Sequence, residues 1–384
     1  MLSYTKKNRM KLLIFTPRYP GKHNSSDYVF VKQFVDAVAN LGHECHVVAP
    51  YNILHYRKII KKHDVYQVGN SRVSVDRPYY LSFSDYKLLG RLTSLSRRNA
   101  IKKVIAGLPD DIDVVYGHFW KSAYEGYEFA KRHGIPLFVA TGESNIAESF
   151  PAKPDQASFS DYVKGVICVS SKSRNESISM GLTVAKKCSV FPNAVNNRLF
   201  RIYQKSDCRK ILNIPQSAFV VVYVGWFNDR KGVLRVADAI KLIKGETVYS
   251  LFIGEGNLKP QCDNILYKGK VKHEILPQYL NAADVFVLPT KNEGCCNAIV
   301  EAMACGLPVI SSDLPFNWDL LDDSNSIMID PDNIEDISRA ITLLRDDQEL
   351  RKRLSEGSVK KAAGLTLDNR AKEIIDFIQE KMDQ

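Results

Sequence analysis

The segment FVVVYVGWFNDRKGVLRVADAIKLIK, residues 219–244, contains a strand, a loop and a helix in direct succession. Its first nine residues are a β-branched and aromatic run that is too short to cross a bilayer and predicts a buried strand. The stretch that starts at Gly232 repeats its apolar residues at helical spacing. Arg230 and Lys231 lie in the loop between this strand and this helix, after Gly225 in the sequence. A strand that runs through a short loop into a helix predicts one unit of a parallel, doubly wound sheet.

The same alternation of strand and helix occurs on both sides of this segment. In the second half, the expected elements are strands at 249–257, 265–271, 284–290 and 308–313 and helices at 274–283 and 297–306. In the first half, they are strands at 11–17, 45–50, 113–120, 136–141 and 163–171 and helices at 30–44, 87–106 and 121–133.

This rhythm, over a length of 384 residues, predicts an α/β chain with two doubly wound, Rossmann-like domains. We expect the domains to cover residues 1–195 and 196–367 and to face each other across a cleft. The amphipathic segment 368–384 predicts a helix whose pattern allows it to pack on either domain, one possibility being that it crosses back to the first. Because open α/β sheets bind ligands at the carboxyl ends of their strands, the chemistry is expected on the loops that follow strands.

Composition excludes several classes of protein. No apolar run reaches the 18 to 20 residues, roughly, of a membrane span, and the LLIF stretch at 12–15 is too short for a signal sequence. Residues 1–9 precede the first strand and are expected to be a disordered extension.

The eight cysteines include no C-x-x-C pair and no zinc spacing, which favours a reducing cytosol. Residues 1–195 contain 28 Lys and Arg against 16 Asp and Glu, whereas the remainder has 25 against 27. A basic half of this kind indicates an anionic surface or polyanion nearby.

The segment NEGCCNAIVEAMACGLPVISS, residues 292–312, places two carboxylates around the start of a helix. Glu293 follows a strand directly, and Glu301 lies one turn beyond Asn297 on the same helical face. Both are expected to face one region, where the helix N-terminus attracts phosphate and carboxylates accept sugar hydroxyls. The alternative is that Glu293 caps the loop and Glu301 is a solvated helix residue.

Arg230 and Lys231 are well placed to hold a diphosphate, Arg through two hydrogen bonds and Lys as a point charge. The loop is not a Walker loop, because its order ends in K-G. Two solvated surface cations are the alternative.

Taken together, these motifs resemble glycosyltransferase family 4, whose members are retaining enzymes with the GT-B fold. The matching motifs are E-x7-E in EGCCNAIVE (293–301), G-x5-K-G in GWFNDRKG (225–232) and the linker PNAVN (192–196). Weaker parallels are IGEGN (253–257), VYGHFW (115–120) and LGHECHVVAP (41–50). The similarity extends over nearly the whole chain.

The resemblance implies a nucleotide-diphospho-sugar donor bound mainly by the C-terminal domain. It implies that Glu301 binds the donor ribose, Glu293 contacts the donor hexose and Lys231 neutralises the diphosphate. His118 would face the transferred sugar from the N-terminal side. The donor-binding residues are then Arg230, Lys231, Glu293, Asn297, Glu301, Gly225 and Gly21, and Glu293, Lys231 and His118 are the catalytic ones.

Three positions depart from the family pattern. Trp226 stands where the family usually has an arginine, and Arg230 lies four residues further along as a replacement charge. Gly142 takes the place of a histidine. The loop after the first strand has Gly21 but is otherwise rich in serine. These departures bear on the identity of the donor more than on the reaction class.

The expected reaction is transfer of the sugar to an acceptor hydroxyl with retention, by front-face attack guided by the donor phosphate. No metal or other cofactor is expected, because the D-x-D sequences at 111–113 and 330–332 lie away from the loops of the site. A covalent intermediate would need a carboxylate nucleophile, for which Glu143 is a candidate by position alone.

The basic half suggests a sugar or lipid-linked acceptor and peripheral contact with an anionic membrane at its cytoplasmic face. The helix at 87–106 alternates leucines with cations, and the segment 55–63 adds more cations. An ordinary amphipathic helix with a solvated face is the alternative.

A nucleic-acid partner is not expected, because no basic stretch is interleaved with aromatic residues. An NAD enzyme is disfavoured, because IGEGN lacks the full G-x-G-x-x-G pattern. A GT-B sugar-nucleotide epimerase and a non-catalytic sugar-nucleotide-binding subunit stay open as alternatives.

Overall fold

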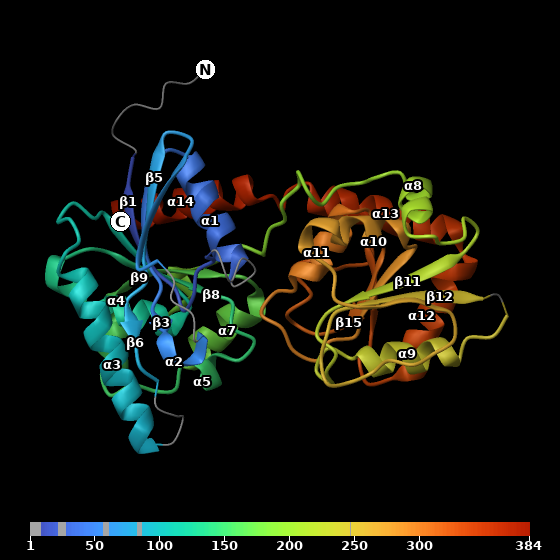
Figure 1. The fold of residues 1–384 in the computed structure, drawn as a ribbon, viewed down its shortest axis with the longest axis horizontal. Coiled ribbons are helices and arrows are strands. Elements are labelled where there is room, and N and C mark those ends of the chain that lie inside the picture. The colour runs from blue at the N-terminus through green and yellow to red at the C-terminus, as the bar shows by residue number, and fades with distance from the viewer. Residues whose placement is uncertain (1–8, 22–27, 57–60, 83–86, 246) are drawn as a thin grey trace. The chain divides into compact units, whose positions relative to one another are not determined.

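The computed structural model describes residues 9–21, 28–56, 61–82, 87–245 and 247–384, without the side chains of 55, 56, 87 and 88. Most of the proposed N-terminal extension (1–9), part of the serine-rich loop and four residues of the basic segment 55–63 lie outside these ranges. The described chain forms two compact units (Figure 1). Unit 1 contains residues 1–169, 173–191 and 371–384, and unit 2 contains 170–172 and 192–370.

Unit 1 is built on one eight-stranded sheet in the order β10-β9-β8-β7-β1-β2-β5-β4. All its neighbouring strands are parallel except β4 and β5, which form an antiparallel hairpin through Gly69 and Asn70. The strands are β1 (Lys11–Phe15), β2 (Glu44–Val48), β4 (His63–Val68), β5 (Ser71–Asp76), β7 (Val114–His118), β8 (Leu137–Thr141), β9 (Val163–Cys168) and β10 (Cys188–Val190). The short strands β3 (Tyr51–Asn52) and β6 (Tyr79–Tyr80) pair separately.

Helices cover both faces of the sheet of unit 1. Helix α4 (Trp120–His133) packs so closely on one face that a Cβ on Gly117 would lie 2.2 Å from the Ala123 backbone. On the opposite face, Phe34 of α1 (Val29–Asn40) stacks on Tyr116 with ring centroids 5.2 Å apart. The other helices of the unit are α2 (Ile53–Tyr56), α3 (Lys87–Ile105), α5 (Ile146–Ser149), α6 (Gln156–Tyr162) and α7 (Ser171–Ser179).

The last helix, α14 (Leu367–Asp383), begins in unit 2 and belongs to unit 1 from Ala371 onward. Its Phe377 ring lies 6.4 Å from Phe138 and 5.6 Å from Phe191, centroid to centroid. Gly165 leaves room for Phe377, whose ring carbon would lie 3.0 Å from a Cβ at that position. The apolar stripe of the C-terminal segment is therefore buried on the sheet of unit 1.

Unit 2 has a fully parallel six-stranded sheet in the order β13-β12-β11-β14-β15-β16. Helices α9 and α12 cover one face, and α10, α11 and α13 cover the other (Figure 1). The strands are β11 (Phe219–Val224), β12 (Val248–Ile253), β13 (Ile265–Gly269), β14 (Val285–Leu288), β15 (Val309–Ser312) and β16 (Ser326–Ile329). The helices are α8 (Lys205–Ile211), α9 (Val233–Lys241), α10 (Leu276–Ala282), α11 (Asn297–Ala304), α12 (Ile334–Asp346) and α13 (Gln348–Ala362).

The elements expected from the sequence are present, most of them with shorter bounds. The run at 219–227 leaves the strand after Val224, and Trp120, expected in a strand, is the first residue of α4. The hairpin of β4 and β5, the strand β16 and the helices α12 and α13 were not expected. The purely parallel sheet expected for the first half is wrong at its edge, because a two-residue turn joins β4 to β5 and a connection this short forces antiparallel pairing.

Candidate active site

The strand order of unit 2 defines where a ligand site can form. Numbered along the chain, the sheet has the order 3-2-1-4-5-6, so β11 and β14 are neighbours in space but not in sequence. The loops that leave these two strands lead to helices on opposite faces and open a crevice at the carboxyl edge. Arg230 and Lys231 follow β11, and Glu293 follows β14. The topology therefore brings the predicted cations and the predicted acid to one switch point.

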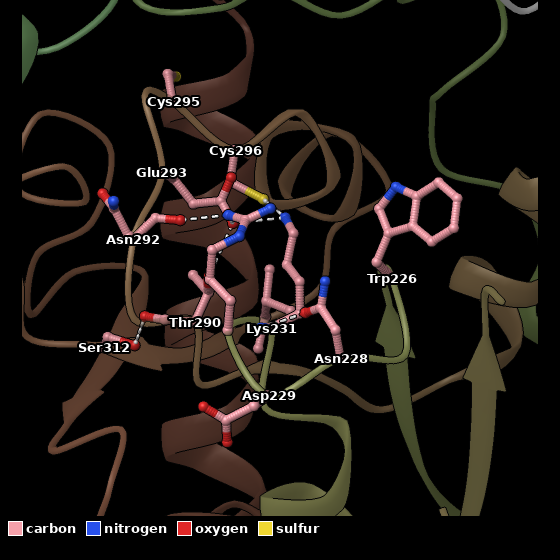
Figure 2. A network of polar contacts seen from close by, with 12 residues as sticks. Trp226, Asn228, Asp229, Lys231, Thr290, Asn292, Glu293, Cys295, Cys296 and Ser312 are labelled. Atoms are coloured by element: carbon pink, nitrogen blue, oxygen red, sulfur yellow. Dashed lines mark hydrogen bonds and ion pairs between the residues drawn. The ribbon is translucent and has the colours of Figure 1, made fainter. Parts of the chain in front are cut away.

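The side chains of these three residues are in direct contact. Figure 2 shows Lys231 and Glu293 of this cluster. Arg230 Nη1 donates to Glu293 Oε1 at 2.8 Å and also to the carbonyl of Asn292. Lys231 Nζ lies 2.6 Å from the same carboxylate oxygen. Thr290 Oγ1 donates to Glu293 Oε1 at 2.8 Å. Three donors from two loops thus converge on one oxygen of Glu293.

This cluster is largely removed from water. The side chains of Lys231 and Glu293 are each 11% exposed, whereas that of Arg230 is 39% exposed. Burial by itself would lower the pKa of Lys231, but its interactions with Cys296 and Glu293 outweigh this effect and raise that pKa. Lys231 is therefore a permanent cation at neutral pH, held where a diphosphate would meet little competition from solvent.

The second oxygen of Glu293 has a different environment. Within the ranges that the structure describes, Oε2 has no hydrogen-bond partner, because the three contacts of the carboxylate all use Oε1. One oxygen therefore fixes the orientation of the group, and the other can accept a hydrogen bond from a ligand hydroxyl. Glu293 and both cations were predicted from the sequence, but Thr290 was not. The position of Thr290 at the carboxyl end of a buried strand is a signal that could have revealed it.

The loop that carries the cations is held by its own residues. Asn228 Oδ1 accepts a hydrogen bond from the backbone N–H of Lys231 at 2.9 Å. Gly232 has φ +76°, and a Cβ there would lie 2.6 Å from the carbonyl oxygen of Pro289. The K-G order of the motif is therefore a packing requirement between the loops after β11 and β14. Asn228 was not named from the sequence, although Asn is a common turn residue because its side chain can bond the backbone of the turn.

Glu301 and Asn297 lie on α11, as expected, but each has a partner that was not expected from the sequence. Glu301 Oε1 lies 2.9 Å from His273 Nε2, and this hydrogen bond raises the pKa of His273. Asn297 Oδ1 accepts from Asn193 Nδ2 at 2.7 Å. The alternative that Glu301 is a solvated helix residue is wrong, because its side chain is only 14% exposed. No sequence spacing links His273 to Glu301, since the pair depends on how η3 (His273–Ile275) packs.

Gly225 and Trp226 lie at the end of β11. A Cβ on Gly225 would meet the Tyr223 hydroxyl at 3.1 Å and Lys231 Cδ at 3.6 Å, so this glycine leaves room for the lysine stem. Trp226 is 58% exposed and stands apart from the cluster in Figure 2. The departure from the family pattern at this position is therefore a surface aromatic residue and not a buried one.

In unit 1, the strands at the corresponding switch point are β7 and β1; His118 is the last residue of β7, and Gly21 lies in the loop after β1. His118 is buried, with the rings of Phe119 and Phe30 4.8 Å and 5.4 Å away. Phe119 has φ +81°, a conformation that costs a non-glycine residue roughly 1–3 kcal/mol. Gly21 lies beside Arg77, whose guanidinium would lie 3.9 Å from a Cβ at that position. Backbone strain of this kind is often found next to functional residues.

Glu143, the candidate nucleophile, has a structural role. One carboxylate oxygen accepts from the backbone N–H of Trp120 at 2.9 Å. The other accepts from Thr141 Oγ1 at 2.8 Å and from the N–H of Gly142 at 2.9 Å. Burial raises the pKa of Glu143, and these hydrogen bonds oppose that effect. With both oxygens bonded at the start of α4, the group is not available as a nucleophile.

Among the residues described, no three His, Cys, Asp or Glu side chains are grouped so as to hold a metal.

Two family matches cover most of the chain. Residues 204–361 match the family described as Glycosyl transferases group 1, and residues 29–198 match Glycosyltransferase Family 4. The first match contains Arg230, Lys231, Glu293 and Glu301, and the second contains His118.

Individual proteins agree with these matches. A teichuronic acid biosynthesis glycosyltransferase of Bacillus subtilis, TuaC, is 25% identical over 88% of this chain and 90% of its own length. A UDP-Gal:alpha-D-GlcNAc-diphosphoundecaprenol alpha-1,3-galactosyltransferase of Escherichia coli is 28% identical over 62% and 67%. Anabaena HepE, solved in complex with UDP-glucose, superposes with a TM-score of 0.71 at 16% identity over 97% of this chain and all of its own. The GT-B fold expected from the sequence is confirmed.

Proposed function

Because the chain belongs to the group 1 glycosyltransferases, we propose that it transfers a sugar, with retention, from a nucleoside-diphospho-sugar to a lipid-linked acceptor in the synthesis of a cell-surface glycan. The nucleoside-diphospho-sugar is the class of ligand with which HepE was solved. A lipid diphosphate carries the acceptor sugar in the name of the E. coli galactosyltransferase.

The observation that carries this proposal is the cluster of Arg230, Lys231 and Glu293 at the switch point of unit 2. Two cations beside one acid leave a net positive charge in a site with little water. The start of α11 adds the unpaired N–H groups of a helix to the same loop. A diphosphate matches this charge, and the sugar attached to it would place a hydroxyl at Glu293 Oε2. The alternative of two solvated surface cations does not fit Lys231, which is buried.

The chemistry follows from these positions. Cleavage of the bond between the sugar and the diphosphate leaves negative charge on the leaving phosphate oxygen, and Arg230 and Lys231 stabilise that charge directly. A metal is not needed in this scheme, and no other cofactor takes part. Glu301 would accept hydrogen bonds from the ribose hydroxyls. The ribose would either displace His273 from Glu301 or bind while that contact is kept. In unit 1, His118 would contact the transferred sugar, and Gly21 would contact the donor phosphate.

Retention then proceeds without a covalent enzyme intermediate. Such an intermediate needs a carboxylate nucleophile, and the candidate Glu143 has both oxygens engaged. In the remaining course, the acceptor hydroxyl attacks from the face that the diphosphate leaves, and a donor phosphate oxygen takes its proton. The new glycosidic bond forms as the bond to the phosphate breaks, so the anomeric configuration is kept.

The acceptor side of the proposal rests on helix α3. Its described N-terminal half exposes Leu89, Leu92 and Leu95, and Arg91 is exposed among them. Apolar side chains beside cations suit the interface of an anionic membrane. We place the reaction at the cytoplasmic face of that membrane, where the eight cysteines, all free thiols, would stay reduced. Within the described residues, no helix is long and apolar enough to cross a bilayer.

Product analysis tests the proposal. The protein is incubated with a panel of radiolabelled nucleoside-diphospho-sugars and with undecaprenyl-diphosphate-linked sugars as acceptors, with and without EDTA. Transfer of label to lipid, in the anomeric configuration of the donor, is expected in both conditions. An inverted product, transfer only to soluble acceptors, or loss of transfer with EDTA would each overturn the corresponding part. Epimerised nucleotide sugar formed without acceptor would favour the epimerase, and an inert protein would favour the non-catalytic subunit.

A further inference from the structure

The indole side chain of Trp226 is exposed, and the backbone of this residue is held by hydrogen bonds. Its carbonyl oxygen accepts from the Tyr223 hydroxyl at 2.8 Å and from the N–H of Asn228 at 2.9 Å. The next residue, Phe227, donates its N–H to the carbonyl of Glu255 at 2.8 Å and is buried. Phe227 is 5% exposed and Trp226 is 58% exposed, so this loop buries one ring and leaves its neighbour in solvent.

Two glycines lock this arrangement in place. A Cβ on Gly254 would lie 1.9 Å from the carbonyl oxygen of Gly225, and one on Gly256 would lie 2.4 Å from that of Phe227. The loops after β11 and β12 are therefore in backbone contact on either side of Trp226. The glycines of IGEGN thus allow this backbone contact.

The indole itself has no partner in the part of the chain that the structure describes. No aromatic ring or cation stacks on it, and no group bonds its Nε1. Trp318, which is also 58% exposed in unit 2, differs in this respect because its Nε1 donates to Asp313 Oδ1 at 2.8 Å. A rigid, exposed and unpartnered aromatic face is suited to stack on a ligand that is not bound here.

The position of Trp226 indicates which part of the donor the indole ring would contact. In Figure 2, Lys231 lies between Glu293 and Trp226. The sheet order places β14, which leads to Glu293, on one side of β11, and β12 and β13 on the other. If the sugar lies toward Glu293 and the diphosphate lies at Arg230 and Lys231, the nucleoside extends toward β12 and β13. The proposed ribose contact agrees, because His273, the partner of Glu301, follows β13.

We propose that Trp226 is the stacking platform for the nucleobase of the donor. This inference rests on the proposed donor site. A base stacked on an aromatic ring contributes about 1–3 kcal/mol, which corresponds to roughly 5- to 150-fold in affinity. The family usually has an arginine at this position, whose charge would serve the diphosphate. In this chain Arg230 supplies the charge, and the tryptophan supplies a π-face that tolerates any base.

Binding of graded ligands tests the inference. Calorimetry is carried out on wild type, Trp226→Ala, Trp226→Phe and the matched control Trp318→Ala, with UDP, GDP and ADP, with the nucleotide sugar UDP-glucose and with inorganic pyrophosphate. Trp226→Ala should weaken nucleoside diphosphate binding by roughly 5- to 150-fold and leave pyrophosphate binding unchanged. Trp226→Phe should recover most of the loss, and Trp318→Ala should bind as wild type. Nucleoside diphosphate should also quench tryptophan fluorescence in Trp318→Phe but not in Trp226→Phe.

Each other outcome overturns a defined statement. Equal nucleoside diphosphate affinity in wild type and Trp226→Ala would overturn the stacking role and leave the donor site intact. Parallel loss of pyrophosphate and nucleoside diphosphate would show that Trp226 acts on the phosphate loop instead. Loss of nucleotide-sugar affinity with normal nucleoside diphosphate affinity would assign the ring to the sugar. Failure of wild type to bind any of the ligands would overturn the donor site itself.

Discussion

Lys231 Nζ lies 2.6 Å from Glu293 Oε1, and the two residues come from loops on either side of the switch point in unit 2. Both side chains are largely buried. A buried ion pair adds little net stability over a well-packed apolar pair, but removing one partner leaves a buried charge uncompensated. The pair therefore connects the stability of unit 2 to its chemistry, and the two can be separated by mutation.

Glu293→Gln is expected to lower the free energy of unfolding by about 3–5 kcal/mol, because Lys231 stays charged and loses its counter-ion. The double variant Glu293→Gln with Lys231→Met should recover most of this loss. Both variants should have lost sugar transfer, by roughly 10²–10³-fold or more, because one electrostatic contact to the developing charge is worth that much. Urea denaturation and initial rates measure the two effects.

The matched control for this prediction is Glu356→Gln, which changes an exposed carboxylate on α13. It should leave both stability and rate within error of wild type. A double variant that regains transfer along with stability would contradict the assignment of Lys231 and Glu293 to the site.

The pair of His273 and Glu301 predicts a pH dependence. The hydrogen bond to Glu301 raises the pKa of His273 above 6.5 in the folded protein. The protonated histidine therefore contributes stability that is fully present below the unfolded pKa of about 6.5 and is lost as the pH rises through the folded pKa. The Tm of wild type should exceed that of Glu301→Gln at about pH 5.5, and the difference should shrink above neutrality. The effect is small, because the His273 side chain is 40% exposed.

Differential scanning calorimetry at several pH values measures this difference, with His63→Gln as a comparison. His63 also faces a carboxylate, Asp76, at 2.8 Å, but its side chain is more exposed, at 56%. A constant difference in Tm between wild type and Glu301→Gln across the pH range would show that His273 does not titrate against Glu301.

The sequence predicted those features that depend on chain-local patterns. The strand, loop and helix at 219–244 placed Arg230 and Lys231 on the correct loop, because periodicity and glycines mark such units. Contacts between distant segments were not accessible in this way. His273 reaches Glu301 only because η3 packs beside α11, and one oxygen of Glu143 is bonded to the N–H of Trp120 only because β8 ends beside the start of α4. Neither fact has a spacing in the sequence that reveals it.

The glycines of IGEGN give a steric prediction. Gly254→Ala would place a Cβ 1.9 Å from the carbonyl oxygen of Gly225, at φ +149°. Such a contact requires the loops after β11 and β12 to separate, and we expect a loss of at least about 2–3 kcal/mol in the free energy of unfolding. Gly90→Ala in α3 is the control, since a Cβ at that position would have nothing within 4 Å. It should stabilise the protein by up to about 1 kcal/mol. Equal effects of the two substitutions on chemical denaturation would contradict the steric argument.

Membrane contact through α3 gives the last prediction, and the structure changes which residues should be tested. Arg97 is buried against Glu125, with Nε 2.6 Å from its carboxylate, so it supports the fold and cannot reach a membrane. Arg98 and Lys102 both pair with Glu128. The charge predicted for this helix is therefore partly neutralised, and Leu89, Arg91, Leu92 and Leu95 are exposed side chains of its described N-terminal half that can meet a lipid surface.

The double variant Leu92→Ser with Leu95→Ser should reduce sedimentation with phosphatidylglycerol vesicles severely, since each buried leucine contributes about 1.5–3 kcal/mol. Arg91→Gln should reduce it by about fivefold, in line with roughly 1 kcal/mol per cation near the surface, and this part should weaken as salt is added. Leu242→Ser, at a leucine that is 48% exposed in unit 2, is the control and should sediment as wild type. Wild-type protein that stays in the supernatant, or a leucine double variant that still sediments fully, would contradict a membrane role for α3.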